Sequence, residues 1–236
     1  MKDSQILICG ENCPARSHSI FNHLTKEELE KLNYENTTES FKRGTELYQE
    51  GSRINGCYCI HSGIIKIYKT GVDGKEQIIR FAKKGNLIGF RSVLSNELAC
   101  TTSKVIEDAI TCYIPGNTLM ELIKRNGNFA IELMQLACRE LGEANTYITD
   151  IAQKTVRERL AEILIHLRQD FGLDEKNVLQ ISLTREELAN IVGTATESVI
   201  RLLSEFKQDQ LIDLNGRKIT ILDEQGLIRI GNLMNG

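Results

Sequence analysis

The sequence predicts an α+β protein with three parts: an N-terminal β-roll of the jelly-roll kind, a long dimerisation helix, and a C-terminal winged helix-turn-helix. Three patterns predict this order. Glycines recur at short intervals between β-type runs over residues 41–115. Apolar residues recur every three or four positions over residues 130–151, and two helix-start signals then precede an Asn-Gly turn. The predicted boundaries are 1–116, 117–152 and 153–236.

The composition fits a soluble chain of two small domains. The length of 236 residues is long for one domain, and 41% hydrophobic and 26% charged residues are ordinary shares. The sequence has no apolar run that could cross a membrane, and its start lacks the apolar stretch of a signal peptide, so a cytoplasmic protein without a membrane partner is expected. The seven cysteines are expected to be reduced, most of them as small buried residues.

The N-terminal part is predicted to contain a short helix followed by the β-roll. A helix is expected from Leu24 to Leu32, where Thr25 and Glu28 form a capping box. In the roll, the runs 57–60, 64–68 and 77–81 have strand composition. Asp73-Gly74 supplies the positive φ angles of a hairpin turn before the last of them. Many short strands with regular turn signals indicate a sandwich or roll.

The second pattern is an apolar seam in a long helix. Its members are spaced alternately by four and three residues: Ala130, Met134, Ala137, Leu141, Ala144, Ile148 and Ile151. Such a narrow seam over about three heptads is typical of a helix paired with another helix. The alternative is a helix that packs on its own domain. Since a long seam favours a like partner, a homodimer is expected.

Two capping boxes predict the helix-turn-helix. They are Thr184-Arg-Glu-Glu187 and Thr194-Ala-Thr-Glu197, with Gly193 in the turn between them. The apolar residues of both helices form internal faces, and five residues of the second point outward: Thr194, Thr196, Glu197, Ile200 and Arg201. Arginine can bind guanine O6 and N7, and glutamate can accept from cytosine N4 in the major groove of DNA.

A hairpin wing follows at Leu211–Leu222, with Asn215-Gly216 as its turn signal. Arg217 and Lys218 at its tip are predicted to touch phosphate, as are Thr184 and Arg185 at the start of the first helix. The net charge of −3 means that any DNA contact comes from a local patch. An ordinary helical bundle with solvated charges is the alternative, but the caps, turn and wing together favour DNA binding.

Over nearly its full length the chain resembles the CRP/FNR superfamily of bacterial regulators. The resemblance lies in residues 43–51, Ile60-His-Ser-Gly-Ile-Ile-Lys66, Gly85–Gly89, Leu183–Gly193 and Glu197–Arg201. It implies a cyclic-nucleotide-binding-type β-roll, a homodimer on palindromic double-stranded DNA, and contact with RNA polymerase. By position, Glu197 and Arg201 look like the family's base-reading pair. Thr196 stands where the cAMP-responsive branch has another guanine-reading arginine, so a half-site nearer TTGA than TGTGA is expected.

The effector of the roll stays open. In the cAMP-binding members, a Gly-Glu-Leu segment and a later Arg-Ser pair hold the nucleotide. The corresponding pocket here would be formed by Leu87, Gly89, Phe90, Arg91, Thr101 and Thr102. The ribose-binding glutamate and the phosphate-binding arginine are both absent. Because an unpaired phosphate would lose its charge partner, cAMP is disfavoured.

An iron–sulfur cluster is a second possibility for the signal. The oxygen-sensing branch of the superfamily holds one through N-terminal cysteines and a cysteine of the roll, positions that Cys9, Cys13 and Cys112 resemble. That branch has three clustered N-terminal cysteines where this chain has two. A further thiolate would have to come from Cys57, Cys59, Cys100 or Cys138. The remaining alternatives are redox sensing by a thiol, buried thiols without a role in sensing, and haem bound through a histidine.

An enzyme is not expected. His61 stands alone in its strand, whereas cupin-type metal enzymes need clustered histidines and carboxylates, and Gly85–Gly89 is too short for a P-loop. A regulatory subunit that binds an effector without DNA is the other alternative, since this roll also occurs in kinases and channels. The predicted wing argues against that alternative.

Overall fold

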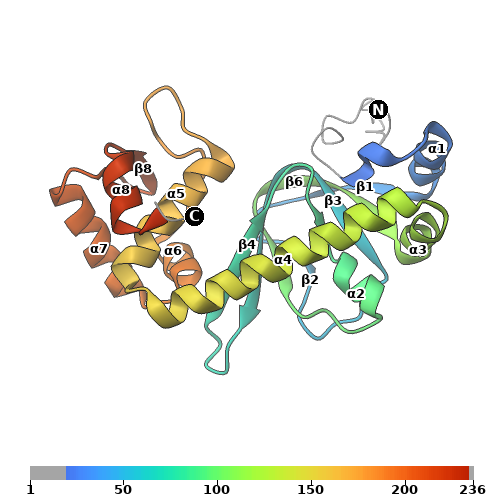
Figure 1. The fold of residues 1–236 in the computed structure, drawn as a ribbon, viewed down its shortest axis with the longest axis horizontal. Helices are drawn as coiled ribbons and strands as arrows, with labels where there is room; N and C mark the ends of the chain where they lie inside the picture. The colour runs from blue at the N-terminus through green and yellow to red at the C-terminus, as the bar shows by residue number, and fades with distance from the viewer. Residues whose placement is uncertain (1–19, 234–236) are drawn as a thin grey trace. The chain divides into compact units, whose positions relative to one another are not determined.

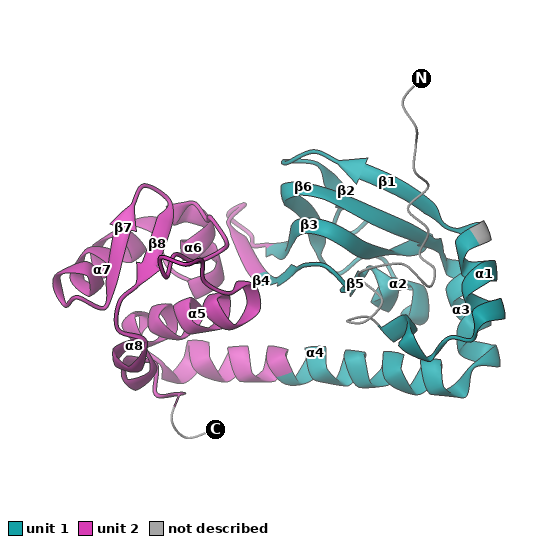
Figure 2. Cartoon of the chain, turned by 90° about the horizontal axis from the view of Figure 1, so that it is seen from above, with its two compact units in different colours: residues 1–69, 79–142 teal, residues 70–78, 143–236 magenta. Residues whose placement is uncertain are grey.

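The computed structural model describes residues 20–233, so Cys9 and Cys13 lie outside the described residues. The order of elements along the chain can be followed in Figure 1. The chain forms two compact units, residues 1–69 with 79–142 and residues 70–78 with 143–236 (Figure 2). Within the described range, no helix has both the length and the apolar character needed to cross a membrane.

An antiparallel β-roll is the framework of the first unit, which confirms the predicted fold class. The strands are β1 (Thr37–Phe41), β2 (Glu46–Tyr48), β3 (Gly56–Thr70), β4 (Glu76–Ala82), β5 (Leu87–Ile88) and β6 (Thr102–Pro115). The order in the sheet is β1-β6-β3-β4, with β2 also paired to β6 and β5 to β3. The predicted hairpin turn lies between β3 and β4, where Gly74 has a φ of +73°.

β3 is one strand of 15 residues where the sequence suggested two short ones. Its register against β6 shifts between Ile60 and Ile65, so the chain bulges here without turning back. Gly63 has a φ of +86° at this point, and a Cβ on it would lie 2.4 Å from the carbonyl oxygen of Asp108. The glycine that looked like a strand boundary is therefore the residue that permits the bulge.

Three cysteines of the roll are core residues. Cys57, Cys59 and Cys112 have exposed fractions of 0%, 3% and 1%, and Cys59 lies opposite Cys112 in the β3–β6 pair. They pack in one apolar cluster with Phe21, Phe129 and residues of the surrounding helices. Burial also raises the pKa of the Cys57 thiol. These three thiols therefore behave as buried apolar side chains, as predicted.

Short helices flank the roll: η2 (Ile20–His23), α1 (Lys26–Glu35), α2 (Phe90–Ser95) and α3 (Gly116–Arg125). α1 has the predicted capping box, in which Thr25 Oγ1 accepts from the Glu28 amide at 3.2 Å and Glu28 Oε2 accepts from the Thr25 amide at 2.8 Å. Leu29 and Leu32 of α1 join the same apolar cluster as the cysteines. The local cap signal therefore placed this helix correctly.

The region predicted as one long helix contains two helices. α3 ends at Arg125, and α4 (Gly127–Gln153) begins after Asn126, whose side chain accepts a hydrogen bond from the Phe129 amide at 3.0 Å. Gly142, where the two compact units divide, is exposed within α4, and a Cβ on it would meet no atom within 4 Å. The long helix of the prediction is therefore α4, with 27 residues.

The second unit is a helical domain with a two-stranded hairpin. It contains α5 (Val156–Phe171), α6 (Arg185–Val192), α7 (Thr196–Gln208), β7 (Ile212–Asn215), β8 (Lys218–Ile221) and α8 (Glu224–Ile230). α6 packs on α7, and α5 packs on α6, α7 and α8. The helices share a core in which Leu160, Leu188, Val199 and Phe206 are fully buried. A helix-turn-helix with a wing is therefore present.

Candidate nucleic-acid interface

The first helix of the pair begins at the predicted cap. Thr184 Oγ1 accepts from the Glu187 amide at 3.0 Å, and Glu187 Oε2 accepts from the Thr184 amide at 2.7 Å. Gly193 ends α6 with a φ of +73°, a left-handed conformation that a residue without Cβ adopts at no steric cost. Thr184 and Gly193 thus fix the two ends of α6.

The second predicted capping box is wrong. α7 begins one residue later than expected, with Ala195 as its N-cap and no side-chain cap bond. The amides of Gly193 and Thr194 both donate to the carbonyl of Ala189, so Thr194 belongs to the turn and its hydroxyl is not at the cap position. Glu197 consequently has no cap to complete, and it is exposed.

α7 has one buried face and one outward face. Val199, Leu202, Leu203 and Phe206 are at most 6% exposed, and they pack against the rest of the unit. The outward face holds the predicted reading residues. Thr196 is partly exposed at the first helical position, and Glu197, Ile200 and Arg201 are all exposed. The structure therefore places these four residues on the first two turns of one helix, on the side away from the core.

The outward charges of α7 are largely free within the described residues. The Arg201 side chain is 73% exposed, and its contact to a carboxylate, Nε to Glu205 Oε1, is 4.0 Å long. Glu205 is better engaged with Arg157, at 3.0 Å. No hydrogen bond or ion pair of Glu197 is found among the described residues. A carboxylate and a guanidinium one turn apart on this face can therefore bind an external partner.

The wing is a tight hairpin braced by Arg185. Asn215 pairs with Lys218, so the loop residues are Gly216 and Arg217, one residue later than the Asn-Gly signal suggested. Arg185 Nη2 donates to the carbonyl of Gly216 at 2.9 Å, and burial lowers the pKa of Arg185. Arg185 was predicted as a phosphate contact, but the structure uses it to hold the wing turn against the start of α6. Arg217 and Lys218 are exposed at the tip.

A buried arginine that the sequence reading missed holds the turn between α6 and α7. Arg159 of α5 is 9% exposed. Its Nε donates to the carbonyl of Val192 at 3.0 Å, its Nη2 to Gly193 at 3.4 Å and its Nη1 to Lys154 at 2.7 Å. Tyr147 Oη also donates to the carbonyl of Ile191, at 3.4 Å. The end of α6 is thereby fastened to α5 and to the last turns of α4.

A second contact fixes the far end of α7. The Arg157 guanidinium lies 4.7 Å from the centroid of the Phe206 ring. It also forms ion pairs with Glu205 at 3.0 Å and Asp209 at 2.7 Å. Arg157 and Arg159 both lie at the start of α5; Arg157 holds the far end of α7, and Arg159 holds the turn that precedes it. The sequence signal for this role was two arginines at the start of an amphipathic helix.

The predicted dimer seam is open to solvent over most of its length. Met134, Leu141, Ile148 and Ile151 are 59%, 63%, 65% and 43% exposed. Ala130, Ala137 and Ala144 are partly exposed between them. Four large apolar side chains in a row on one helix face are an unusual amount of exposed apolar surface.

The six residues proposed for an effector pocket have different surroundings. Leu87 and Phe90 are buried in the apolar cluster of the three cysteines. Thr102 is 6% exposed and accepts from the Glu50 amide at 2.9 Å. Arg91 is exposed and lines an open cavity of about 390 Å³ near Cys100. Gly89 is the left-handed N-cap of α2, and Thr101 is partly exposed. Phe90, at the position of the family's ribose-binding glutamate, is therefore a core residue.

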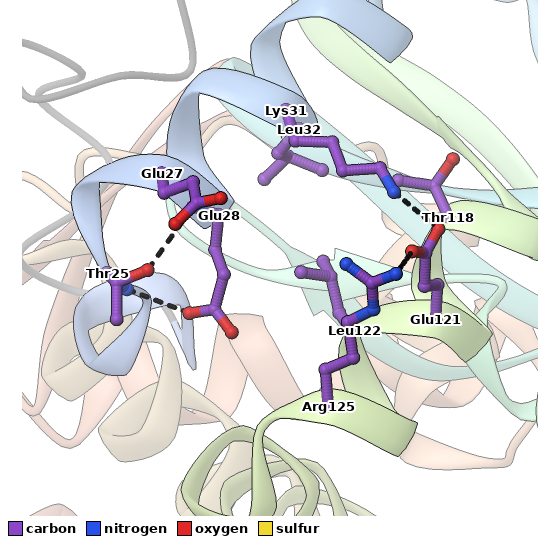
Figure 3. A pocket seen from close by; sticks show the side chains of 9 residues that line it. All are labelled: Thr25, Glu27, Glu28, Lys31, Leu32, Thr118, Glu121, Leu122 and Arg125. Carbon is purple, nitrogen blue, oxygen red and sulfur yellow. Dashed lines mark hydrogen bonds and ion pairs between the residues drawn. The ribbon is translucent and has the colours of Figure 1, made fainter.

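Another cavity, of about 280 Å³, lies between α1 and α3 (Figure 3). Its lining includes Lys31, Glu121 and Arg125. The Glu121 carboxylate is 2.6 Å from Lys31 Nζ and 2.8 Å from Arg125 Nη2. The cations of this lining are thus already paired with a carboxylate.

Comparison with known proteins matches both units. Residues 38–126 match the cyclic nucleotide-binding domain, and residues 158–230 match the Crp-like helix-turn-helix domain. The fumarate and nitrate reduction regulatory protein of Yersinia pestis is 28% identical over 211 residues, which cover 88% of this chain and 84% of that protein. Transcriptional activator protein FnrA of Stutzerimonas stutzeri is 29% identical over 188 residues, covering 79% and 77%.

The fold is also similar to a solved structure, FixK2 from Bradyrhizobium japonicum. The TM-score is 0.75 at 22% identity, and the match covers 83% of this chain and 96% of that one. At 22% identity this similarity supports the fold alone. The similarity in sequence to transcription regulators rests on the relatives from Yersinia pestis and Stutzerimonas stutzeri.

Proposed function

We propose that this chain, which belongs to the CRP/FNR superfamily of DNA-binding transcription regulators, binds palindromic promoter sites as a homodimer and reads them with Glu197 and Arg201. The observation that carries the proposal is the outward face of α7. It presents both side chains with their charges largely uncommitted, on a helix whose turn is fastened by Arg159 and whose far end is held by Arg157. Helix-turn-helix proteins dock in this way, with the N-terminal residues of the second helix at base edges.

Three further groups support the DNA contact. The amides at the start of α6, beyond the Thr184 cap, can face a phosphate. Arg217 and Lys218 at the wing tip can reach phosphates on the other side, because the loop that carries them is braced by Arg185. With few cations and a net charge of −3, binding should be strongly weakened by salt.

The experiment is a selection of bound sites from random duplex DNA, followed by affinity measurements on the selected site. Arg201→Ala should lower specific affinity by about 5- to 150-fold, which corresponds to roughly 1–3 kcal/mol for one bidentate base contact. Gln208→Ala, at the last residue of α7, is the matched control. Selection of a TGTGA half-site would contradict the expected TTGA type, and unchanged operator affinity of Arg201→Ala would contradict its assigned role.

The homodimer is supported by the exposed seam of α4. Leu141→Glu places a charge in the middle of this row and should give monomers in sedimentation or light-scattering measurements. Gln135→Glu, exposed on the same helix but outside the seam, should leave the mass unchanged. If Leu141→Glu kept the assembled mass of the wild-type protein, α4 would be ruled out as the dimer interface.

The signal sensed by the roll is not cAMP in this proposal. Phe90, buried in the core, stands where the cAMP-binding branch has its ribose-binding glutamate. The described residues do not fit an iron–sulfur cluster either, since they contain no group of three or more histidine, cysteine or carboxylate side chains that could hold a metal. Cys9 and Cys13 lie outside the described residues. Anaerobic purification followed by iron and sulfide assays tests the cluster, and iron-free protein would end that alternative.

The remaining parts of the proposal follow from the family. The protein acts in the cytoplasm, contacts RNA polymerase at the promoters it binds, and has no catalytic activity. A pull-down of RNA polymerase on promoter DNA, with and without the selected site, tests the second of these points. Recovery of polymerase that does not depend on the regulator would contradict it.

A further inference from the structure

Ile200 is an exposed apolar residue in the middle of the reading face. It is 48% exposed, while the core-facing residues of α7 on either side of it, Val199 and Leu202, are at most 6% exposed. The packing of α7 is therefore complete without Ile200. A β-branched side chain also has a lower helix propensity than alanine at an exposed position. Stability of the unit thus offers no reason for isoleucine here.

The outward residues of α7 lie in two adjacent rows. Glu197 and Arg201 are four residues apart and form a charged row. Thr196 and Ile200 are also four residues apart and form a parallel row of methyl groups. Ser204 would continue the second row, but its hydroxyl donates to the Ile200 carbonyl at 3.0 Å and is not free for a base. The apolar row is therefore short and lies next to the charged row.

We propose that Ile200 recognises the 5-methyl group of a thymine next to the base pair that Glu197 and Arg201 read, with the Thr196 methyl extending the same contact. This inference rests on the proposed function, because it requires α7 in the major groove. In that groove the thymine methyl is the apolar group that distinguishes the base pairs, and aliphatic side chains recognise it by contact. A branched aliphatic side chain cannot donate or accept a hydrogen bond, so Ile200 selects thymine by burial of the methyl alone.

The test removes that methyl group and nothing else. Each thymine of the selected site is replaced in turn by deoxyuridine, which has the same hydrogen-bonding edge without the 5-methyl group. Wild-type protein should lose about fourfold in affinity at one thymine per half-site, the factor that corresponds to burial of one methyl group. Ile200→Ala should bind the thymine site more weakly and should bind the thymine and deoxyuridine sites equally well.

Matched controls separate this effect from a general loss of affinity. Leu222→Ala truncates another exposed aliphatic side chain of the same unit, 56% exposed and outside α7, and it should retain the full response to deoxyuridine. Arg201→Ala should lose specific binding whether the site contains thymine or deoxyuridine. Because Ile200 is exposed, its alanine variant is expected to unfold at or above the wild-type temperature, which thermal unfolding checks.

The outcomes distinguish this inference from the proposed function. If Ile200→Ala keeps the wild-type response to deoxyuridine, the inference is overturned while the proposed function stands on the Arg201 result. The same holds if wild-type protein shows no response at any thymine. If no variant of α7 changes DNA affinity, the proposed function fails and the inference fails with it.

Discussion

Replacing Arg159 with alanine is expected to destabilise the C-terminal unit by about 3–6 kcal/mol. The side chain is 9% exposed, so little water is available to replace its contacts. The donations to Lys154 at 2.7 Å and to Val192 at 3.0 Å are good hydrogen bonds from a charged group, each contributing roughly 1.5–3 kcal/mol. The third contact, to Gly193 at 3.4 Å, adds little. A domain stability of about 5–15 kcal/mol leaves the unit folded but marginal.

The assay is urea denaturation of the full chain followed by circular dichroism. The two units are treated as separate transitions because a two-unit chain need not unfold in one step. Arg168→Ala is the matched control on the same helix, since it removes a surface ion pair with Glu224 at 2.9 Å, which contributes roughly 0–1 kcal/mol. Arg159→Lys keeps the charge but loses the planar guanidinium, so its unfolding midpoint in urea should lie between those of Arg159→Ala and Arg168→Ala. If Arg159→Ala and Arg168→Ala unfolded at the same urea concentration, the fastening role would be refuted.

Three other predictions concern local structure. Gly63→Ala should destabilise the roll strongly, because the added Cβ would meet the Asp108 carbonyl oxygen at 2.4 Å and the φ is +86°; a roll transition at the wild-type urea concentration would contradict the bulge. Thr184→Ala should cost about 1 kcal/mol through loss of the α6 cap, measured against Ser182→Ala, which is exposed ahead of the helix. The Glu158 carboxylate accepts from the Thr155 amide, which lowers its pKa below the usual 4.5, so its stabilisation is present above that pH and is lost as the pH falls through the lowered value. Glu158→Gln should flatten this acid dependence, and an unchanged pH profile would count against it.

Local signals placed much of the fold. The caps at Thr25 and Thr184, the turn at Gly193 and the wing hairpin each depend on residues within a few positions of one another, so a single sequence reveals them. The apolar period along α4 is equally local. These features made the fold class and the outward face of α7 predictable before the structure was known.

One failure has a local cause, and the others depend on contacts that are distant in sequence. The Thr194 box looked like a cap, but Thr194 belongs to the turn because its amide donates to Ala189. Gly63 looked like a strand end, but the approach of the Asp108 backbone from β6 makes it a bulge. Arg159 and Arg185 serve backbone carbonyls more than 30 residues away, and no local pattern announces such partners.

Gly142 gives α4 an uneven stiffness. Glycine is the weakest helix former after proline, roughly 1 kcal/mol below alanine, so the helix bends most easily at the residue where the two units divide. Beyond it, hydrogen bonds of Tyr147 and Arg159 connect the end of α4 and the start of α5 to the end of α6. The apolar seam runs across the joint, with Leu141 before it and Ala144 after it. A second copy of the seam packed along α4 would contact this helix on both sides of Gly142.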